Sequence, residues 1–484
     1  MADNWKLLLS KAKALLTRRE ERPSPSRNPS SRPDDSRLLE KQPFRQIRPI
    51  DALLGIDFGT RFTKVALNLP HIDQRRVLSL SEDTGKLFPS RILIDDSGHA
   101  VPPDHTWIQQ GGTQIEYLKM RLARPAGEAF RENIELHGLP LQKLIPCLSA
   151  LFLAGIIRQA QAAAMKAFPV EMSLGRTINW RANVGVPVKY HDSPEITAFQ
   201  DVCGVAWLWK DRAPESIQLA TLLNDYKSSL ASLPEPIERA IQVAPELTAA
   251  LAHFGENRNT AEGMYALFDI GGGTVDGTVF RLIRAEGRVR FSIFSAEVAD
   301  VGTMVVARQA AQRFGAAAND IERAIVLNEA LPAPVDLSDA ATVKMIQCLF
   351  ARVIITAKKT AGPAAFSGQL EAGKPRWVSD LVGRDPIVPV FLAGGGARSR
   401  WYSSIFERTH KDFNQQRAGI GGYAMRLLPP PPQYIEDDYP RFLIANGLSA
   451  ERLLFQEYRL PSQTSQQSQF EAATTTEAIS KDMV

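Results

Sequence analysis

The chain has 484 residues, of which 44% are hydrophobic and 23% charged, so it can bury a large core and is expected to hold two or three domains. Its three cysteines (Cys147, Cys203 and Cys348) lie far apart, which argues against a zinc site or a disulfide framework and suits a reducing compartment. Residues 1–50 carry 12 basic and 6 acidic side chains, so the remaining residues sum to −2 despite the net charge of +4. A nucleic-acid-binding body would be basic, so no nucleic-acid partner is expected.

Residues 1–19 are predicted to form a short basic amphipathic helix. One face carries the apolar residues Trp5, Leu8, Leu9, Ala12, Leu15 and Leu16, spaced as on a helix. A helix this short is marginal alone and gains stability by docking. It is expected to bind a protein partner or a membrane surface, and the sequence does not choose between these two; the alternative is that it folds back onto its own body. The run Leu7–Leu9 is too short for a signal peptide, and a cytoplasmic location is expected.

Two polar segments flank the body of the chain. Residues 20–50 are rich in Pro, Ser and Arg, and the segment is predicted to be a disordered linker because it has too little apolar surface to offset the entropy of ordering. Residues 456–484 are rich in Gln, Ser and Thr and are predicted to be a disordered tail. The folded part is therefore expected between them.

One motif occurs twice in the folded part. Residues 53–67 read as an apolar strand that ends in Asp57, a turn with Gly59 and Thr60, and a second strand. Residues 265–280 repeat this pattern with Asp269, three glycines (Gly271, Gly272 and Gly273) and Thr274. A single such turn is weak evidence because any β-hairpin can use Asp and Gly, but two copies are much harder to dismiss.

The composition of these turns suits phosphate binding. Glycines let the backbone approach a phosphate closely and direct successive N–H groups at its oxygens. The hydroxyls of Thr60 and Thr274 can add donors, and Asp57 and Asp269 can hold Mg²⁺ directly or through water. Two hairpins facing each other would clamp a triphosphate.

A third glycine cluster follows another apolar strand. Residues 389–398 predict a buried strand that runs through Gly394, Gly395 and Gly396 into a helix. Glycines here allow a flat ring to pack against the backbone, and the guanidinium of Arg398 can stack on a purine.

Together these segments resemble the nucleotide-binding domain of the seventy-kilodalton heat-shock chaperones (DnaK type), within the actin-like ATPase superfamily. The resemblance spans about residues 52–455, in the order Asp57–Thr60, Val184–Tyr190, Pro245–Leu251, Asp269–Asp276, Ala357–Thr360, Gly394–Arg398 and Asn446–Leu448. It implies an α/β, actin-like ATPase fold of two lobes, 51–250 and 251–455. Each lobe would be built on an RNase H-like mixed sheet with flanking helices, and the nucleotide cleft would lie between them.

The resemblance also implies ATP and Mg²⁺ as cofactors, and it assigns roles by position. Asp57 and Asp269 would organise the metal, and Glu246 and Asp276 would orient the attacking water. The phosphates would contact the first two glycine turns, and the adenosine would lie against the third one. The implied cofactor-binding residues are Gly59, Thr60, Gly271, Gly272, Gly273, Thr274, Lys358, Lys359, Gly394, Gly395, Gly396 and Arg398.

Four features depart from the family pattern. Residues 87–116 contain no lysine, although the chaperones use one there for phosphoryl transfer; Lys86 and Lys119 flank the gap. Ile355 stands in place of an acidic residue in the adenosine helix, and an extra segment runs from Trp207 to Pro236. That segment is either a recognition feature or a surface helix pair with a buried Trp. After Phe455 too few residues remain for a peptide-binding domain, so a complete foldase is not expected.

The leading hypothesis is a DnaK-like nucleotide switch without a client-binding domain. Slow ATP hydrolysis would drive lobe closure, and residues 1–19 would pass the motion to a protein partner. A chaperone-like pseudo-ATPase stays open, because a missing phosphate-site lysine would slow hydrolysis. The alternatives from other classes are an actin-like filament-forming ATPase and a small-molecule kinase.

Overall fold

The computed structural model describes residues 49–103, 111–123, 134–172, 177–212, 215–235, 237–252, 254–255, 260–285, 288–361, 388–415, 423–430, 438–450 and 457–464. The predicted amphipathic helix, most of the predicted linker and most of the predicted tail lie outside these ranges.

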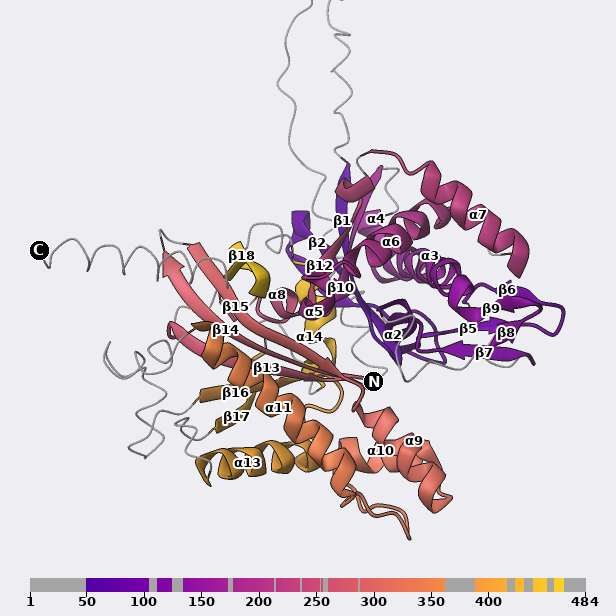
Figure 1. Cartoon of the computed structure of the whole chain (residues 1–484). Helices are drawn as coiled ribbons and strands as arrows, with labels where there is room; N and C mark the ends of the chain where they lie inside the picture. The colour runs from indigo at the N-terminus through magenta and orange to yellow at the C-terminus, as the bar shows by residue number, and fades with distance from the viewer. Residues whose placement is uncertain are drawn as a thin grey trace, which may run out of the picture. The chain divides into compact units, whose positions relative to one another are not determined.

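The first large sheet is mixed. Its strands run in the order β12-β10-β1-β2-β3, and β4 pairs with β2 (Figure 1). The bounds are β1 Ile50–Phe58, β2 Phe62–Leu69, β3 Gln74–Val77, β4 Phe88–Pro89, β10 Ile178–Val186 and β12 Ile241–Pro245. β1 pairs antiparallel with β2 and parallel with β10, which pairs parallel with β12. Eight of the nine β1 residues are buried, as expected of a central strand covered on both faces.

The second large sheet repeats this topology. Its order is β17-β16-β13-β14-β15-β18, with bounds β13 Gly263–Ile270, β14 Val275–Ala285, β15 Arg288–Ala299, β16 Val388–Ala393, β17 Tyr423–Leu427 and β18 Glu457–Arg459. In both sheets a three-stranded antiparallel meander is followed by two strands parallel to its first strand. The predicted α/β class with mixed sheets is therefore confirmed.

Helices and a smaller sheet surround the first large sheet (Figure 1). The helices are α2 Leu118–Ala123, α3 Leu141–Ala167, α6 Ile196–Trp209 and α7 Leu219–Ala231, and the smaller sheet has the order β11-β6-β5-β7, with bounds Ile217–Gln218, His99–Val101, Arg91–Ile94 and Thr113–Glu116. Trp209 is buried, and its Nε1 donates a hydrogen bond to Ser229 Oγ at 2.9 Å. The described part of the extra segment thus contributes to the core, as the helix-pair interpretation expects.

In the described part of the chain, the helices between β15 and β17 are α9 Thr303–Phe314, α10 Ala318–Leu327, α11 Ala340–Ala361 and α13 Arg400–Gln415. α11 and α13 pack on the sheet through aromatic contacts. The ring of Phe268 in β13 lies 4.8 Å from that of Phe350 and 5.0 Å from that of Phe406, centroid to centroid.

Two helices, α8 Glu246–Ala250 and α14 Tyr439–Leu448, pack against each other, and α14 contacts strands of both large sheets. A Cβ at Gly447 would lie 1.8 Å from the carbonyl oxygen of Ala249, so this close approach requires glycine. α14 also packs on β1. It therefore contacts the first sheet although it belongs, by sequence, to the predicted second lobe. The remaining short elements are η1 Pro70–Ile72, β8 Glu135–Leu136, β9 Leu139–Pro140, α4 Pro169–Met172, α5 Val188–His191 and η4 Ile237–Arg239.

Two predicted boundaries need correction. Ile50, the last residue of the predicted linker, begins β1. Residues 457–464 of the predicted disordered tail are ordered, because β18 pairs with β15 and Glu457 accepts a 2.7 Å hydrogen bond from Arg290 Nε.

Within the described ranges, two helices, α3 and α11, have the length and hydropathy of a membrane span. In α3, 78% of the most apolar window is buried inside the protein, against 39% in α11. The apolar character of α3 is therefore explained by its place in the core.

Candidate functional site

The turns of the two repeated hairpins touch each other. The first joins β1 to β2 and contains Thr60 and Arg61; the second joins β13 to β14. A Cβ at Gly273 would lie 2.3 Å from Thr60 Cγ2, and one at Gly272 would lie 2.9 Å from Arg61 Cβ. Side chains at either glycine would push the turns apart, so the glycines permit the contact.

A cavity of about 350 Å³ opens beside the two turns, and we call it the turn cavity. It is lined by Asp57, Gly59, Thr60, Arg61, Phe62, Lys64, Leu87, Lys119, Glu246, Asp269, Gly271, Gly272, Thr274, Asp276, Thr303, Asn319, Glu322, Arg323, Val326, Leu327, Gly394, Gly395, Arg441 and Ile444. The two aspartates that end the inner strands, Asp57 and Asp269, thus face the same space.

The start of α9 fixes the second turn. The N–H groups of Gly302, Thr303 and Met304 donate to the carbonyls of Gly273, Gly271 and Gly272 at 3.1, 2.9 and 2.8 Å. In a trans peptide the N–H points opposite to the carbonyl. The N–H groups that follow these carbonyls therefore point away from α9, in the manner of a backbone cradle for an anion.

Three carboxyl groups gather at one end of the turn cavity. Glu246 begins α8, while Asp269 and Asp276 are register partners in β13 and β14, and one oxygen from each lies within 4.8 Å of the other two. The Oδ1 atoms of both aspartates are shielded from solvent and accept no hydrogen bond from any described residue. Buried carboxylate oxygens that lack a donor fit a hard divalent cation such as Mg²⁺.

The pKa values of the three carboxyl groups are all raised. Burial, followed by the charges of Glu246 and Asp57, raises the pKa of Asp269 to about 7. Burial and the nearby Glu246 raise the pKa of Asp276 well above its ordinary value, and burial also raises the pKa of Glu246. Ionisation of Asp269 and Asp276 is therefore costly without a further positive charge beside them.

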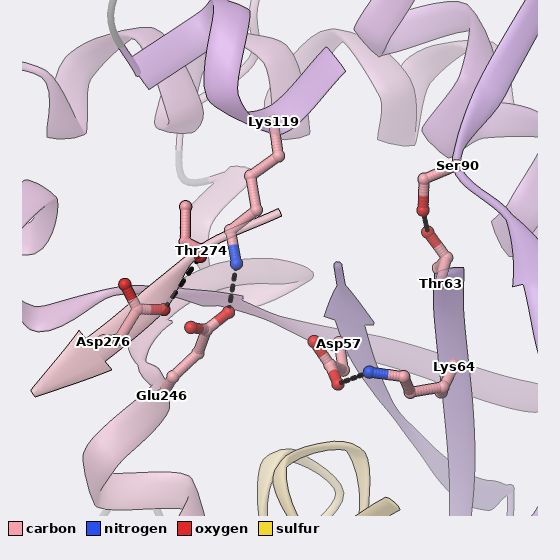
Figure 2. Close-up of polar contacts among 8 residues, drawn as sticks. All are labelled: Asp57, Thr63, Lys64, Ser90, Lys119, Glu246, Thr274 and Asp276. Atoms are coloured by element: carbon pink, nitrogen blue, oxygen red, sulfur yellow. Dashed lines mark hydrogen bonds and ion pairs between the residues drawn. The ribbon is translucent and has the colours of Figure 1, made fainter. Parts of the chain in front are cut away.

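Two lysines, which the sequence analysis did not assign to the site, lie among these carboxylates (Figure 2). Lys64 Nζ is 2.6 Å from Asp57 Oδ2, and Lys119 Nζ is 2.5 Å from Glu246 Oε1. Burial alone would lower the pKa of Lys119, but the charges of Glu246, Asp57 and Asp276 outweigh it, and the pKa is raised. Lys119 therefore stays charged.

Neither lysine comes from the segment in which the resemblance to the chaperones expects one. Residues 87–116 indeed lack one, but Lys119 in α2 reaches into the turn cavity. Two signals could have found the pair: Lys64 is the register partner of Asp57 across the hairpin, and Lys119 lies between apolar residues in a buried helix.

The third glycine cluster packs on the second turn. Gly394 has a φ of 84°, and a Cβ there would lie 2.1 Å from Asp269 Oδ1. The N–H of Gly396 donates to the carbonyl of Ile270 at 2.9 Å. Gly394 and Gly395 line the turn cavity together with Asp269.

Other predicted residues do not line the turn cavity, namely Gly273, Lys358, Lys359, Gly396 and Arg398. Lys358 and Lys359 lie in the last turn of α11, which packs on β14 and β15. Part of the wall of the turn cavity comes instead from α10, which sequence reasoning missed. The α10 lining residues, Asn319, Glu322, Arg323, Val326 and Leu327, share one helical face.

α10 is linked through the carboxylate of Glu322 to the first turn and to the start of α9. Glu322 accepts a 2.8 Å hydrogen bond from Thr303 Oγ1 at the start of α9. It also pairs with Arg61 of the first turn, whose Nη2 donates to Asn319 Oδ1 at 3.1 Å. Burial, reinforced by the nearby Arg308, lowers the pKa of Arg61 to about 10.

No protein-family model matches the chain, and a search of the curated proteins finds no significant match.

Proposed function

We propose that this chain binds ATP with Mg²⁺ in the turn cavity and acts as a DnaK-like nucleotide switch without a client-binding domain. The observation that carries the proposal is the meeting of two aspartate–glycine turns, one from each large sheet, at one cavity, where four carboxyl groups lie beside the ammonium groups of Lys64 and Lys119. A divalent cation would bind at the buried Oδ1 atoms of Asp269 and Asp276, which accept no hydrogen bond from any described residue.

The repeated topology of the two sheets supports an actin-like fold for this protein. In each sheet the first hairpin carries the aspartate and the glycine turn. Two copies of one sheet, each presenting the same turn to a shared cavity, are the arrangement that the resemblance to the chaperones implies.

The residues present can divide the work of holding a triphosphate. The backbone of the second turn, with the hydroxyls of Thr60 and Thr274, would donate to phosphate oxygens. Lys64 and Lys119 would add positive charge beside the same oxygens. The face of α10 that includes Val326 and Leu327 would contact the base and ribose.

Mg²⁺ would be held by Asp269 and Asp276, directly or through water, and it would neutralise charge on the phosphates. Asp57 would contribute through the water shell. Lys119 binds Glu246 in this structure, so a phosphate that attracts Lys119 would release Glu246 to orient the attacking water. On this basis we propose slow ATP hydrolysis, because positioning and charge stabilisation are what phosphoryl transfer requires.

Nucleotide binding would be coupled to motion through Arg61. Its contacts with Asn319 and Glu322 connect the first turn to α10, and all three residues line the turn cavity. A bound triphosphate would compete for Arg61 and so change this connection. We further propose that residues 1–19 report the change to a protein partner, which binding of that segment to the partner with and without nucleotide would test.

Calorimetric titration of the full chain with Mg–ATP tests the function. The wild type should bind one nucleotide per chain. Asp269→Asn should weaken binding by at least about tenfold, or about 1.4 kcal/mol, because it removes a carboxylate that would hold Mg²⁺. Asp73→Asn, the same change at an exposed residue outside the turn cavity, is the control and should bind normally. Absence of binding by the wild type, or equal binding by all three proteins, would refute the proposal.

A further inference from the structure

A second cavity lies next to the first turn, and we call it the arginine cavity. Its volume is about 400 Å³, and its polar wall is formed chiefly by Arg61, Arg91, Glu116, Tyr117, Arg308 and Asn319. Arg61 and Asn319 also line the turn cavity, so the two spaces are neighbours. The volume lies within the range of small-molecule sites in proteins.

Positive charge dominates the arginine cavity. Three guanidinium groups line it, while Glu116 is its one acidic lining residue. Glu322 contacts Arg61 from the turn cavity, and with it the guanidinium groups still outnumber the carboxylates by three to two. Arginines at positions 61, 91 and 308 come from three distant parts of the chain, and folding brings them to one wall.

The arginine side chains are held by their neighbours. Arg308 Nη2 is 2.6 Å from Glu116 Oε2, and its guanidinium carbon lies 5.0 Å above the centre of the Tyr117 ring. Such stacking and pairing fix a guanidinium plane in advance of ligand binding.

Ser90, the residue before Arg91, is hydrogen-bonded to the backbone of Arg61. The N–H of Ser90 donates to the carbonyl of Arg61 at 2.8 Å, and Ser90 Oγ is 2.8 Å from Thr63 Oγ1 (Figure 2). These bonds hold the segment before Arg91 against the first turn.

Tyr117 has an unusual backbone. Its φ of 60° places a non-glycine residue in the left-handed region, which is unfavourable for residues with a Cβ. This conformation occurs between β7 and α2, where Tyr117 lies under Arg308 and Lys119 enters the turn cavity. Strain of this kind persists only where the surroundings enforce it, and it gathers at binding sites.

We infer that the arginine cavity binds a small organic molecule through a phosphate or carboxylate group, at a site separate from that of the nucleotide. Planar guanidinium groups recognise both kinds of oxyanion through paired hydrogen bonds. Pro89 and Met304, which also line the cavity, offer apolar surface for the rest of the ligand, whereas guanidinium groups lie over the rings of Tyr117 and Phe62.

Titration of the full chain with inorganic phosphate and with malonate, at constant ionic strength and without nucleotide, tests the inference. Arg308→Gln should weaken binding of the favoured anion at least tenfold, and the better probe will show whether the ligand is a phosphate or a carboxylate. Glu116→Gln should tighten binding, because it removes the competing carboxylate. Arg313→Gln is the matched control: Arg313 lies on the same helix and pairs with Asp339 at 3.3 Å, but it does not line the cavity.

Lys119→Met separates the two sites, because Lys119 lines only the turn cavity. The inference predicts that this variant binds the anion normally even if it loses nucleotide. Anion binding that is lost in Lys119→Met and kept in Arg308→Gln would place the anion in the turn cavity and overturn the inference. Failure of both probes to bind the wild type, or equal binding by all the variants, would also overturn it.

Discussion

Lys119 and Glu246 form an ion pair that is almost fully buried, with side-chain exposures of 8% and 7%. Removing one partner from such a pair leaves the other charge uncompensated and costs about 3–5 kcal/mol, whereas removing both costs much less. The pair therefore affects stability and the proposed nucleotide binding in separable ways.

We predict that Lys119→Met lowers the free energy of unfolding in urea by about 3 kcal/mol and weakens nucleotide binding. The double variant Lys119→Met/Glu246→Gln should recover most of the stability and none of the binding. Lys143→Met, at an exposed position of α3, should be close to wild type. A double variant no more stable than the single one would show that the pair does not act as described.

Asp269 makes stability depend on pH. Its pKa of about 7 in the folded protein is above the ordinary 3.8, so folding favours the protonated form. This contribution is fully present below about pH 4 and is lost as the pH rises through 7. Without divalent cations, Asp269→Asn should therefore gain stability relative to wild type between pH 5.5 and 8, by on the order of 2 kcal/mol.

Urea unfolding at both pH values measures this difference, with Asp73→Asn as the control that should show no such trend. A difference between Asp269→Asn and wild type that stays constant with pH would contradict the assigned pKa. Mg²⁺ should stabilise the wild type more at pH 8 than at pH 5.5, because more of the carboxylates are then ionised.

At the scale of elements, the loop after β16 depends on Gly394. Alanine there would combine a left-handed φ with a Cβ only 2.1 Å from Asp269 Oδ1. Gly85 also has a positive φ, of 59°, but open space around it. Alanine at either position would have an unfavourable left-handed backbone, but only at position 394 would its Cβ collide with a neighbouring atom.

We predict that Gly85→Ala costs about 1–2 kcal/mol of stability and Gly394→Ala at least about 2 kcal/mol more. Only Gly394→Ala should also weaken Mg–ATP binding, since it displaces Asp269. Urea unfolding and calorimetry of the two variants check this. Equal costs at both positions would mean that the loop can move away from Asp269 freely.

The hairpins were predictable because their signals are local. An apolar strand, a terminal Asp and a glycine turn specify β1–β2 and β13–β14 within about fifteen residues each. The approach of Thr60 to Gly273 followed only from the assumption that the two copies face each other.

The missed residues depend on tertiary structure. Lys119 reaches Glu246 across 127 positions of sequence, and nothing local marks that contact. α10 lines the turn cavity because Thr303 and Arg61 hold Glu322, while α11, where Lys358 and Lys359 lie, is packed on the second sheet. Helix periodicity predicts which face of a helix is apolar, but it does not predict which element that face contacts.

At the scale of the whole molecule, the proposal requires one ligand to contact both large sheets. Arg61 joins the first turn to α10, and Arg308 in α9 pairs with Glu116 in β7 at 2.6 Å. These contacts connect the first turn and β7 to α9 and α10, the elements that would close on a nucleotide. A ligand in the turn cavity should therefore order both turns together.

Amide hydrogen exchange of the full chain, with and without Mg–ATP, tests this claim most directly. We predict slower exchange in Gly59–Phe62, in Gly271–Thr274 and in α10 at the same nucleotide concentration, with the interior of α3 unchanged as the internal control. Protection confined to one turn, or no protection at saturating nucleotide, would contradict the account.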